Sequence, residues 1–300
     1  MVVAGAAAAD RFGIGWRPEL AAGILTNRDR LDVVEVIVEA YLDAGREGAR
    51  AVRTLSRSIP VVLHGLSLGL ASTVPVDEAR LRAVADFVAT VDPPFWSEHL
   101  AYVRGAQIEV GHLLAPPRSA TTVAAAARNI RRAAEVVGAV PLMENVATLL
   151  DPPGSDLDEA LWIGEVASQA PCGLLLDLHN VYTNCLNLGH DPLRFVADLP
   201  FDRIQAIHLA GGMLIEEPRR EAEPPRHRVL DDHRHPVPDL VYQLLTEVGT
   251  RVPHPLTVLL EYDGCYPPID DLLAQIDRAR DALAAGRAAT AGVARLGELL

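Results

Sequence analysis

Cysteine and long apolar stretches are scarce in this 300-residue sequence. Its three cysteines, Cys172, Cys185 and Cys265, are odd in number and form no CxxC pair, which disfavours a disulfide framework or a thiolate-bound metal and fits a reducing cytoplasm. No run approaches the roughly 18 apolar residues that a membrane-spanning helix needs. Residues 1–9 lack the basic segment of a signal peptide, so we expect a disordered lead-in there and a cytoplasmic protein.

Positive charge is also scarce. The formal net charge is −13, whereas proteins that bind nucleic acids rely on Lys and Arg at phosphates. Short motifs of phosphate and acyl chemistry are missing as well. The glycine-containing segment 64–69 has no Walker lysine, and there is no GxSxG elbow. We therefore expect no nucleic-acid partner, no phosphate-binding loop of this kind and no Ser-His-Asp triad.

What the sequence does contain is a set of six short apolar runs, each ending in a residue that can bind a metal. Such runs, bounded by turn residues, predict buried parallel strands. The runs cover residues 61–64, 95–99, 140–144, 174–177, 204–208 and 258–261, and they end at His64, His99, Glu144, Asp177, His208 and Glu261.

Two further strands, at 12–16 and 33–38, bring the expected number to about eight. Amphipathic segments at 43–56, 76–90, 121–137, 157–169, 192–199 and 238–248 predict helices between the strands. This alternation predicts an α/β fold of the (β/α)8 TIM-barrel type, in a single domain over 1–300 with its core at about 12–268. Residues 269–300 are expected to form a helical extension with breaks at Gly286 and Gly292 and a mobile stretch at 284–294.

The C-terminal ends of barrel strands converge on one face, so the six strand-end residues are expected to meet there. A single His at a strand end is more often structural, but a buried carboxylate such as Glu144 or Asp177 needs a cationic partner. The partners on offer are His rather than Arg or Lys, which favours a metal site with more than one ion. Nitrogen and oxygen ligands without thiolate suit iron, manganese or zinc. Glu144 is the candidate bridge between two ions.

A long, polar, proline-rich segment at 211–238 interrupts the alternation, and a loop of this length is usually functional or disordered. If its cluster Asp231-Asp232-His233-Arg234-His235 is extended, Asp231, His233 and His235 point the same way. The alternative is a polar surface loop. His179 and Asn180 follow Asp177 at a strand end, where a turn would bring either one inward.

Together these segments resemble a known family, the multinuclear non-haem iron-dependent oxidases, which include the oxidase of methanobactin biosynthesis. The resemblance spans about residues 13–267, and its fold is a xylose isomerase-like TIM barrel. It implies two or three irons of mixed Fe(II)/Fe(III) state, and O2 as co-substrate. It further implies a ribosomally synthesised precursor peptide modified at cysteine, and a small partner protein that recognises the leader. The motifs are LHGLSLGLAS (63–72), WSEHLAY (96–102), MENVATLL (143–150), LLLDLHNVYTNCLNLG (174–189), IHLAGG (207–212), LDDHRHPV (230–237) and LLEYDG (259–264).

The order of the ligands also resembles the three-zinc apurinic endonucleases of the same barrel group. The resemblance implies three metal sites, with Glu144, Asp177 and His208 as catalytic residues, and a weaker third ion because an amide ligates less well than imidazole. It assigns His64, His99 and Glu144 to the first ion, Glu144, Asp177, His208 and Glu261 to the second, and Asn180, Asp231 and His233 to the third.

Two positions depart from the oxidase pattern. His179 stands where Asn is expected, and Gly212 stands where many relatives have His, so no ligand is transferred to position 212. The roles of His179, His227 and His235 stay open. A metal-dependent hydrolase or isomerase on the same barrel, such as a phosphodiesterase or a sugar isomerase, is the alternative function, with zinc as the alternative metal. A non-catalytic metal-binding or partner-binding barrel is a third.

Overall fold

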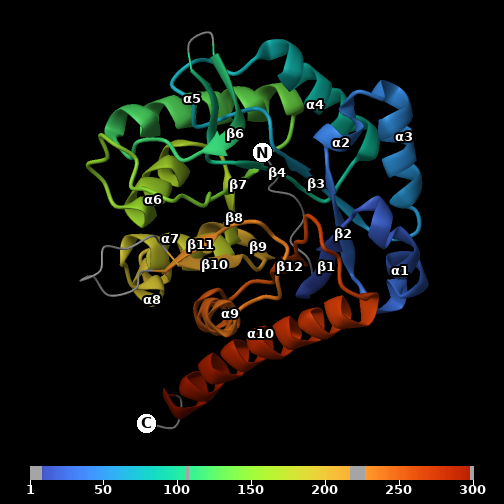
Figure 1. Ribbon diagram of the computed structural model, residues 1–300, viewed down its shortest axis with the longest axis vertical. Helices are drawn as coiled ribbons and strands as arrows, with labels where there is room; N and C mark the ends of the chain where they lie inside the picture. Colours follow the sequence, from blue (N-terminus) through green and yellow to red (C-terminus); the bar gives the residue numbers. More distant parts are fainter. Residues whose placement is uncertain (1–8, 106–107, 217–226, 298–300) are drawn as a thin grey trace.

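The computed structural model describes residues 9–105, 108–216 and 227–297, with residues 291–297 described by their backbone alone. Eight parallel strands close a barrel in the order β1-β12-β9-β8-β7-β4-β3-β2, surrounded by helices (Figure 1). The predicted TIM barrel is therefore confirmed, and every predicted strand corresponds to a barrel strand. The barrel strands are β1 (Arg11–Gly15), β2 (Val33–Ile37), β3 (Val61–Gly65), β4 (Trp96–His99), β7 (Leu142–Glu144), β8 (Gly173–Asp177), β9 (Ile204–Leu209) and β12 (Thr257–Leu260).

The helices follow the predicted segments, with two short additional helices, three 3-10 turns and one longer addition, α7. Capping residues explain several boundaries: Asp77 accepts hydrogen bonds from the backbone of Ala79 and Arg80 at the start of α4, and Gly138 ends α5 in the left-handed conformation. The helices are α1 (Ala21–Thr26), α2 (Glu39–Leu42), α3 (Gly45–Leu55), α4 (Glu78–Val91), α5 (Ala120–Val137), α6 (Glu159–Gln169), α7 (Leu178–Leu188), α8 (Pro192–Ala197), α9 (Asp239–Arg251) and α10 (Ile269–Gly297), with 3-10 turns η1 (Pro18–Leu20), η2 (Arg28–Arg30) and η3 (Phe201–Arg203).

The C-terminal extension is one continuous helix, α10, which packs against α9 (Figure 1). The predicted breaks at Gly286 and Gly292 are therefore wrong. A Cβ on Gly286 would lie 2.2 Å from the carbonyl oxygen of Thr246 and 2.9 Å from the Cα of Gly249. Gly286 is thus a site of close packing against α9 rather than a helix end. None of the described helices combines the length and apolar character needed to span a bilayer.

Two antiparallel hairpins interrupt the alternation of barrel strands and helices. Neither of them was predicted from the sequence. One pairs β5 (Tyr102–Gly105) with β6 (Ile108–Leu114), and the other pairs β10 (Met213–Glu216) with β11 (His227–Leu230). The second hairpin occupies much of the segment predicted as a loop at 211–238, whose residues 217–226 lie outside the described part. Both hairpins follow barrel strands, so they extend from the C-terminal face of the barrel.

The barrel interior is filled by apolar layers below that face. Val33, Val62 and Leu259 form one buried cluster, and Leu142, Leu175 and Ala206 form another, with Phe95 packed against both. Leu142, Leu175 and Ala206 come from three neighbouring strands, and Val33 and Leu259 come from the strands on either side of β1. Such inward-facing side chains are those of a packed TIM-barrel core. The chemistry of the barrel is therefore confined to the layer above these clusters.

Candidate metal centre

The candidate ligands form the next layer of the barrel interior. Side chains alternate along a strand, so a residue two positions beyond an inward-facing one also faces inward. This relation links Val62 to His64 and Leu142 to Glu144. The same step leads from Leu175, Ala206 and Leu259 to the remaining predicted strand-end ligands, which are Asp177, His208 and Glu261.

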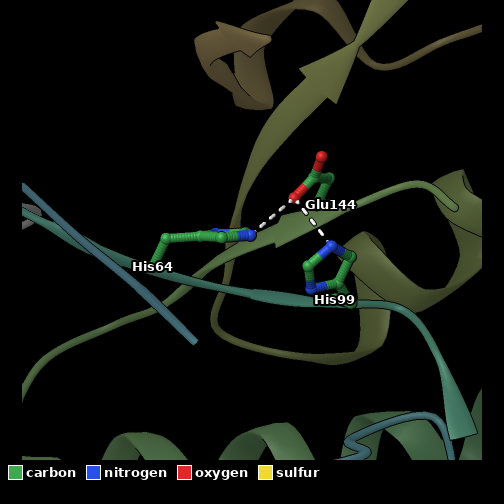
Figure 2. A group of neighbouring side chains, drawn as sticks. All are labelled: His64, His99 and Glu144. Atoms are coloured by element: carbon green, nitrogen blue, oxygen red, sulfur yellow. Dashed lines mark ion pairs between the residues drawn. The ribbon is translucent and has the colours of Figure 1, made fainter. Parts of the chain in front are cut away.

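The first group joins His64, His99 and Glu144 from three neighbouring strands (Figure 2). The Nε2 atoms of both histidines lie 3.3 Å from the same carboxylate oxygen, Oε2 of Glu144. Their other ring nitrogens are engaged elsewhere. Nδ1 of His64 lies 2.8 Å from Ser97 Oγ, and Nδ1 of His99 lies 3.2 Å from the carbonyl oxygen of Gly65. Both Nε2 atoms are thus aimed at one point beside Glu144.

The second group joins Glu144, Asp177, His208 and Glu261, all of them buried. Nδ1 of His208 lies 3.2 Å from Oε1 of Glu144 and 3.3 Å from Oε2 of Glu261. Glu144 therefore presents one oxygen to each group, which is the arrangement required of a bridging carboxylate. Asp177 also starts α7, because its Oδ1 accepts a hydrogen bond from the backbone N–H of Asn180.

The third group is assembled from α7 and the segment after β11. Oδ1 of Asp231 lies 2.8 Å from Nδ1 of His179 and 2.8 Å from Nε2 of His233. The predicted alignment of His235 with this pair is wrong, since its Nδ1 lies 3.0 Å from Oδ1 of Asp232 instead. His233 has a positive φ of 50°, so the backbone turns there and the alternation of an extended chain is lost. His227, at the start of β11, is exposed.

Asn180, the amide predicted for the third ion, lies one residue beyond His179 in α7. Its Nδ2 donates a hydrogen bond to the carbonyl oxygen of Asn145 at 2.9 Å, which orients the amide. Its Oδ1 is buried without a hydrogen-bond partner in the described part of the chain. The oxygen that a cation would bind is therefore left available.

Buried polar atoms without hydrogen-bond partners are rare, and each costs roughly 1–3 kcal/mol if nothing satisfies it. Within the described residues, several such atoms gather at this centre. A metal cluster satisfies such atoms, so the donor set fits one. The atoms that ligands would use are Oε2 of Glu144, Oδ2 of Asp177, Oδ1 of Asn180 and Nε2 of His233, and Nε2 of His179 is a further unpartnered atom beside them.

Without an ion, the charges of the centre shift one another strongly. Burial works against the charged form of His99, but the negative charges of Glu144 and Glu98 outweigh it and raise the pKa of His99 to about 9. Burial and the neighbouring charge of Glu144 raise the pKa of Asp177 well above its ordinary value. For Glu261, burial is outweighed by His233 and His208, which hold its pKa well below the ordinary value. Protons thus balance the negative charge that an ion would otherwise balance.

Glu35 is a member of this centre that the sequence analysis missed. It lies on β2 and is 1% exposed, and its Oε1 lies 3.0 Å from Nε2 of His208. A carboxylate on the far nitrogen of a metal-binding His fixes the orientation of the ring and leaves the other nitrogen for the metal. The signal was present in the sequence, since Glu35 is the one charged residue inside the apolar strand 33–38 and stands two positions after Val33.

A cavity of about 600 Å³ opens onto the ligand layer. Its floor includes His99, Glu144, Asn180, Asp231 and Glu261. Its walls are mainly apolar and come from β6, the segment after β7, and β11; they include Leu113, Leu114, Val146, Leu149, Leu150, Val229 and Leu230. A ligand-sized space with apolar walls and convergent polar groups is the usual form of a binding site.

Comparisons with known proteins show the family of this chain. A family model described as the RiPP precursor modification enzyme MbnB/TglH/ChrH matches residues 11–284. A UPF0276 protein of Caulobacter vibrioides is 33% identical over 279 residues, which cover 93% of this chain and 96% of that protein. A UPF0276 protein of Pseudomonas aeruginosa is 33% identical over 256 residues, with 84% of each chain covered.

Solved structures share the fold at low sequence identity. A xylose isomerase domain protein from Planctomyces limnophilus matches with a TM-score of 0.59 at 16% identity, covering 95% of this chain and 99% of that one. A D-allulose 3-epimerase from Methylomonas sp. matches with a TM-score of 0.58 at 12% identity, covering 92% and 97%. These similarities confirm the predicted xylose isomerase-like barrel.

Proposed function

The chain belongs to the MbnB/TglH/ChrH family of RiPP precursor modification enzymes, which act on ribosomally synthesised and post-translationally modified peptides, and from that premise we propose that it is an iron-dependent, O2-consuming oxidase of such a peptide. The reacting residue would be a cysteine of the precursor. The observation that carries the proposal is the set of buried, unpartnered ligand atoms at the floor of an open cavity. A structural metal site would be closed, whereas a catalytic one keeps access for substrate.

The residues that would hold iron are those of the three groups. His64, His99 and Glu144 would bind one ion, and Glu144 would share a second with Asp177, His208 and Glu261. Asp231, His233 and Asn180 are proposed for a third. Bound as a mixed Fe(II)/Fe(III) cluster, iron would supply the redox chemistry by which electrons pass from the peptide to O2. Imidazole and carboxylate ligands suit iron, and zinc is the alternative occupant.

The chain's own contribution is positioning and shielding. His99, Glu144, Glu261 and other donors line the cavity directly, so a side chain that enters it reaches the ligand layer. The apolar walls, including Val146 and Val229, would exclude bulk water around the reacting group, which strengthens electrostatic interactions inside. Such walls suit a short uncharged peptide segment.

The cavity lies between the two hairpins, whose outer surfaces carry exposed apolar side chains such as Ile108 and Leu214. Large apolar side chains that gather on a surface often mark contact sites for other chains. We include in the proposal a small partner protein that recognises the leader of the precursor. The cysteine-bearing part of the precursor would then occupy the cavity.

The rival function is metal-dependent hydrolysis or isomerisation of a phosphodiester or a sugar. A phosphate group usually needs cationic side chains. The cavity is lined by no arginine among the described residues, and the whole sequence contains no lysine. The likeness to sugar epimerases shows the fold alone, since the identities are 16% or less. The cavity lining therefore disfavours a phosphodiester, and the family match favours a peptide substrate.

The test is to express the protein with iron supplementation and purify it without chelators. Metal analysis and Mössbauer spectroscopy should show two or more irons per chain with a coupled, mixed-valent signal. Oxygen uptake should then depend on a cysteine-containing precursor peptide encoded beside this gene, and a Cys→Ser version of that peptide should not support it. Stoichiometric zinc that iron cannot replace, with hydrolysis of a model phosphodiester, would establish the rival function instead.

A further inference from the structure

His179 is the residue of the metal centre for which the family resemblance implies no role. It lies in the first turn of α7 and is 0% exposed, and its Nδ1 lies 2.8 Å from Oδ1 of Asp231. Its Nε2 is buried without a hydrogen-bond partner in the described part of the chain. Nδ1 is therefore the ring nitrogen that lies among the donors of the third group.

Gly212, which lies outside α7, leaves the space that the His179 ring occupies. A Cβ on Gly212 would lie 2.7 Å from Cε1 of His179, 3.0 Å from its Nε2 and 2.2 Å from the carbonyl oxygen of Leu230. No larger residue fits at position 212 while the His179 ring stays where it is. On its other sides the ring lies near Tyr182 and His233, with centroid distances of 5.9 and 6.2 Å. The imidazole is thus held in one place.

The distances around Asp231 show what the site lacks. Two histidine nitrogens lie 2.8 Å from the same oxygen, yet the approach of His233 Nε2 has no hydrogen-bond geometry. Nδ1 of His179 is hydrogen-bonded to this oxygen in the metal-free protein, and one ligand atom from each of His179, Asp231 and His233 lies within 4.8 Å of the others. Metal–ligand bonds of about 2.0–2.2 Å place neighbouring ligands of one ion at such separations. An ion bound between these three residues would take the place of the proton on Nδ1 of His179.

We propose that His179 is a ligand of the outer ion, binding through Nδ1 beside Asp231 and His233, and that Gly212 is the residue that makes room for it. The inference shares with the proposed function the premise that the centre holds metal, but it needs neither iron nor O2 nor a peptide. Its consequence is that the outer site has two imidazoles and a carboxylate, in addition to the amide of Asn180. The outer ion is then bound more tightly than an amide-based site predicts.

The experiment loads the metal-free protein with Co(II) and follows binding by equilibrium dialysis and paramagnetic NMR. The wild type should bind an outer ion whose affinity falls at least about tenfold in His179→Asn, because even residues behind the ligands change metal affinity 10–100-fold. With Nδ1 on the metal, the Nε2–H proton of His179 should give a hyperfine-shifted, exchangeable signal that this variant lacks. The matched control is His235→Asn, the same change at a histidine outside the cluster. It should alter neither the affinity of the outer ion nor the hyperfine-shifted signal.

A second variant tests the glycine. Gly212→Ala should displace the His179 ring and weaken the outer ion as His179→Asn does, while the inner ions stay bound. Unchanged Co(II) binding in His179→Asn, combined with loss of the outer ion in Asn180→Ala, would overturn the proposal. So would weaker binding that leaves every shifted histidine N–H signal in place, because His179 would then only position Asp231. A protein that binds Co(II) in this way, but whose iron-loaded form consumes no O2 with the precursor peptide, would contradict the proposed function. This inference would still stand.

Discussion

The inner and outer donors of the metal centre are built on different kinds of scaffold. The inner residues, such as His64 and Glu144, are at the ends of barrel strands and are at most 7% exposed as residues. The outer pair Asp231 and His233 follows a hairpin, with side chains that are 20% and 13% exposed. Strand ends are fixed by hydrogen bonds to both neighbours, whereas a connecting segment has fewer constraints. The inner ions should therefore be held tightly, and the outer ion should exchange.

The largest effect is expected when Glu144→Gln, in the inner site, is compared with Asp231→Asn, in the outer site. Glu144 faces two groups, so its loss should remove both inner ions and abolish oxidation, whereas Asp231→Asn should remove only the outer ion. Metal content per chain, measured with oxygen uptake, distinguishes the two. The drop for Glu144→Gln should exceed the roughly 10–100-fold effect of residues behind the ligands. Equal metal losses in the two variants would mean that the centre is one cooperative cluster.

The difference between ligands at strand ends and ligands on connecting segments also decided what could be predicted from the sequence. The barrel and the six strand-end residues were accessible because a strand alternates with a fixed period, and a polar residue at the end of an apolar run is visible without any tertiary information. Glu35 obeys the same rule and was overlooked, although it stands two residues after Val33. Its partner His208 is far away in sequence, and only the closed barrel brings them together.

The outer site could not be derived in this way. The position of His179 depends on helix α7 starting at Asp177, and that of His233 on a left-handed residue in a turn. Neither feature has a periodic signal. The space at Gly212 is set by contacts with Leu230 and His179 from two other elements. The two hairpins were missed because their strands are short and largely exposed, so they lack the apolar runs that marked the barrel strands.

The metal-free protein offers a second test, because protons then balance the inner carboxylates. The pKa of His99 is about 9 there, above its ordinary 6.5, so its stabilising effect is complete below pH 6.5 and is lost as the pH rises through 9. The contribution is at most roughly 3 kcal/mol, from about 1.4 kcal/mol per pKa unit. The difference in Tm between metal-free wild type and His99→Asn should thus narrow from pH 6 to pH 10.

Metal loading should show the opposite dependence, since ligand nitrogens must be deprotonated to bind an ion. Metal uptake by the wild type should therefore improve over the same pH range in which the metal-free protein loses stability. A difference in Tm that stays constant with pH would mean that the His99 proton does not stabilise the metal-free centre.

Glu35→Gln tests the difference between the inner and outer ions with a smaller expected effect. The amide keeps the size of the side chain and can still accept from Nε2 of His208, but it removes the negative charge that strengthens the ligand. The affinity of the inner ions should fall about tenfold, with the outer ion unchanged, as measured by competition with a chelator. Glu47→Gln, on the exposed face of α3, is the control. A change in the outer ion alone would show that Glu35 acts through the fold and not through His208.

The smallest effect is expected from a substitution in the cavity wall that leaves every metal ligand in place. Leu150 is 66% exposed at the wall of the cavity, and Leu161 is 52% exposed on α6, outside it. Covering part of Leu150 with peptide is worth about 1 kcal/mol, so Leu150→Ser should raise KM for the precursor about fivefold. Leu161→Ser should not, and metal content and kcat should stay unchanged in both. Equal KM values for the two variants would mean that the peptide reaches the ligands without contacting this wall. The apolar rim would then serve a partner protein, and the metal layer alone would select the reacting residue.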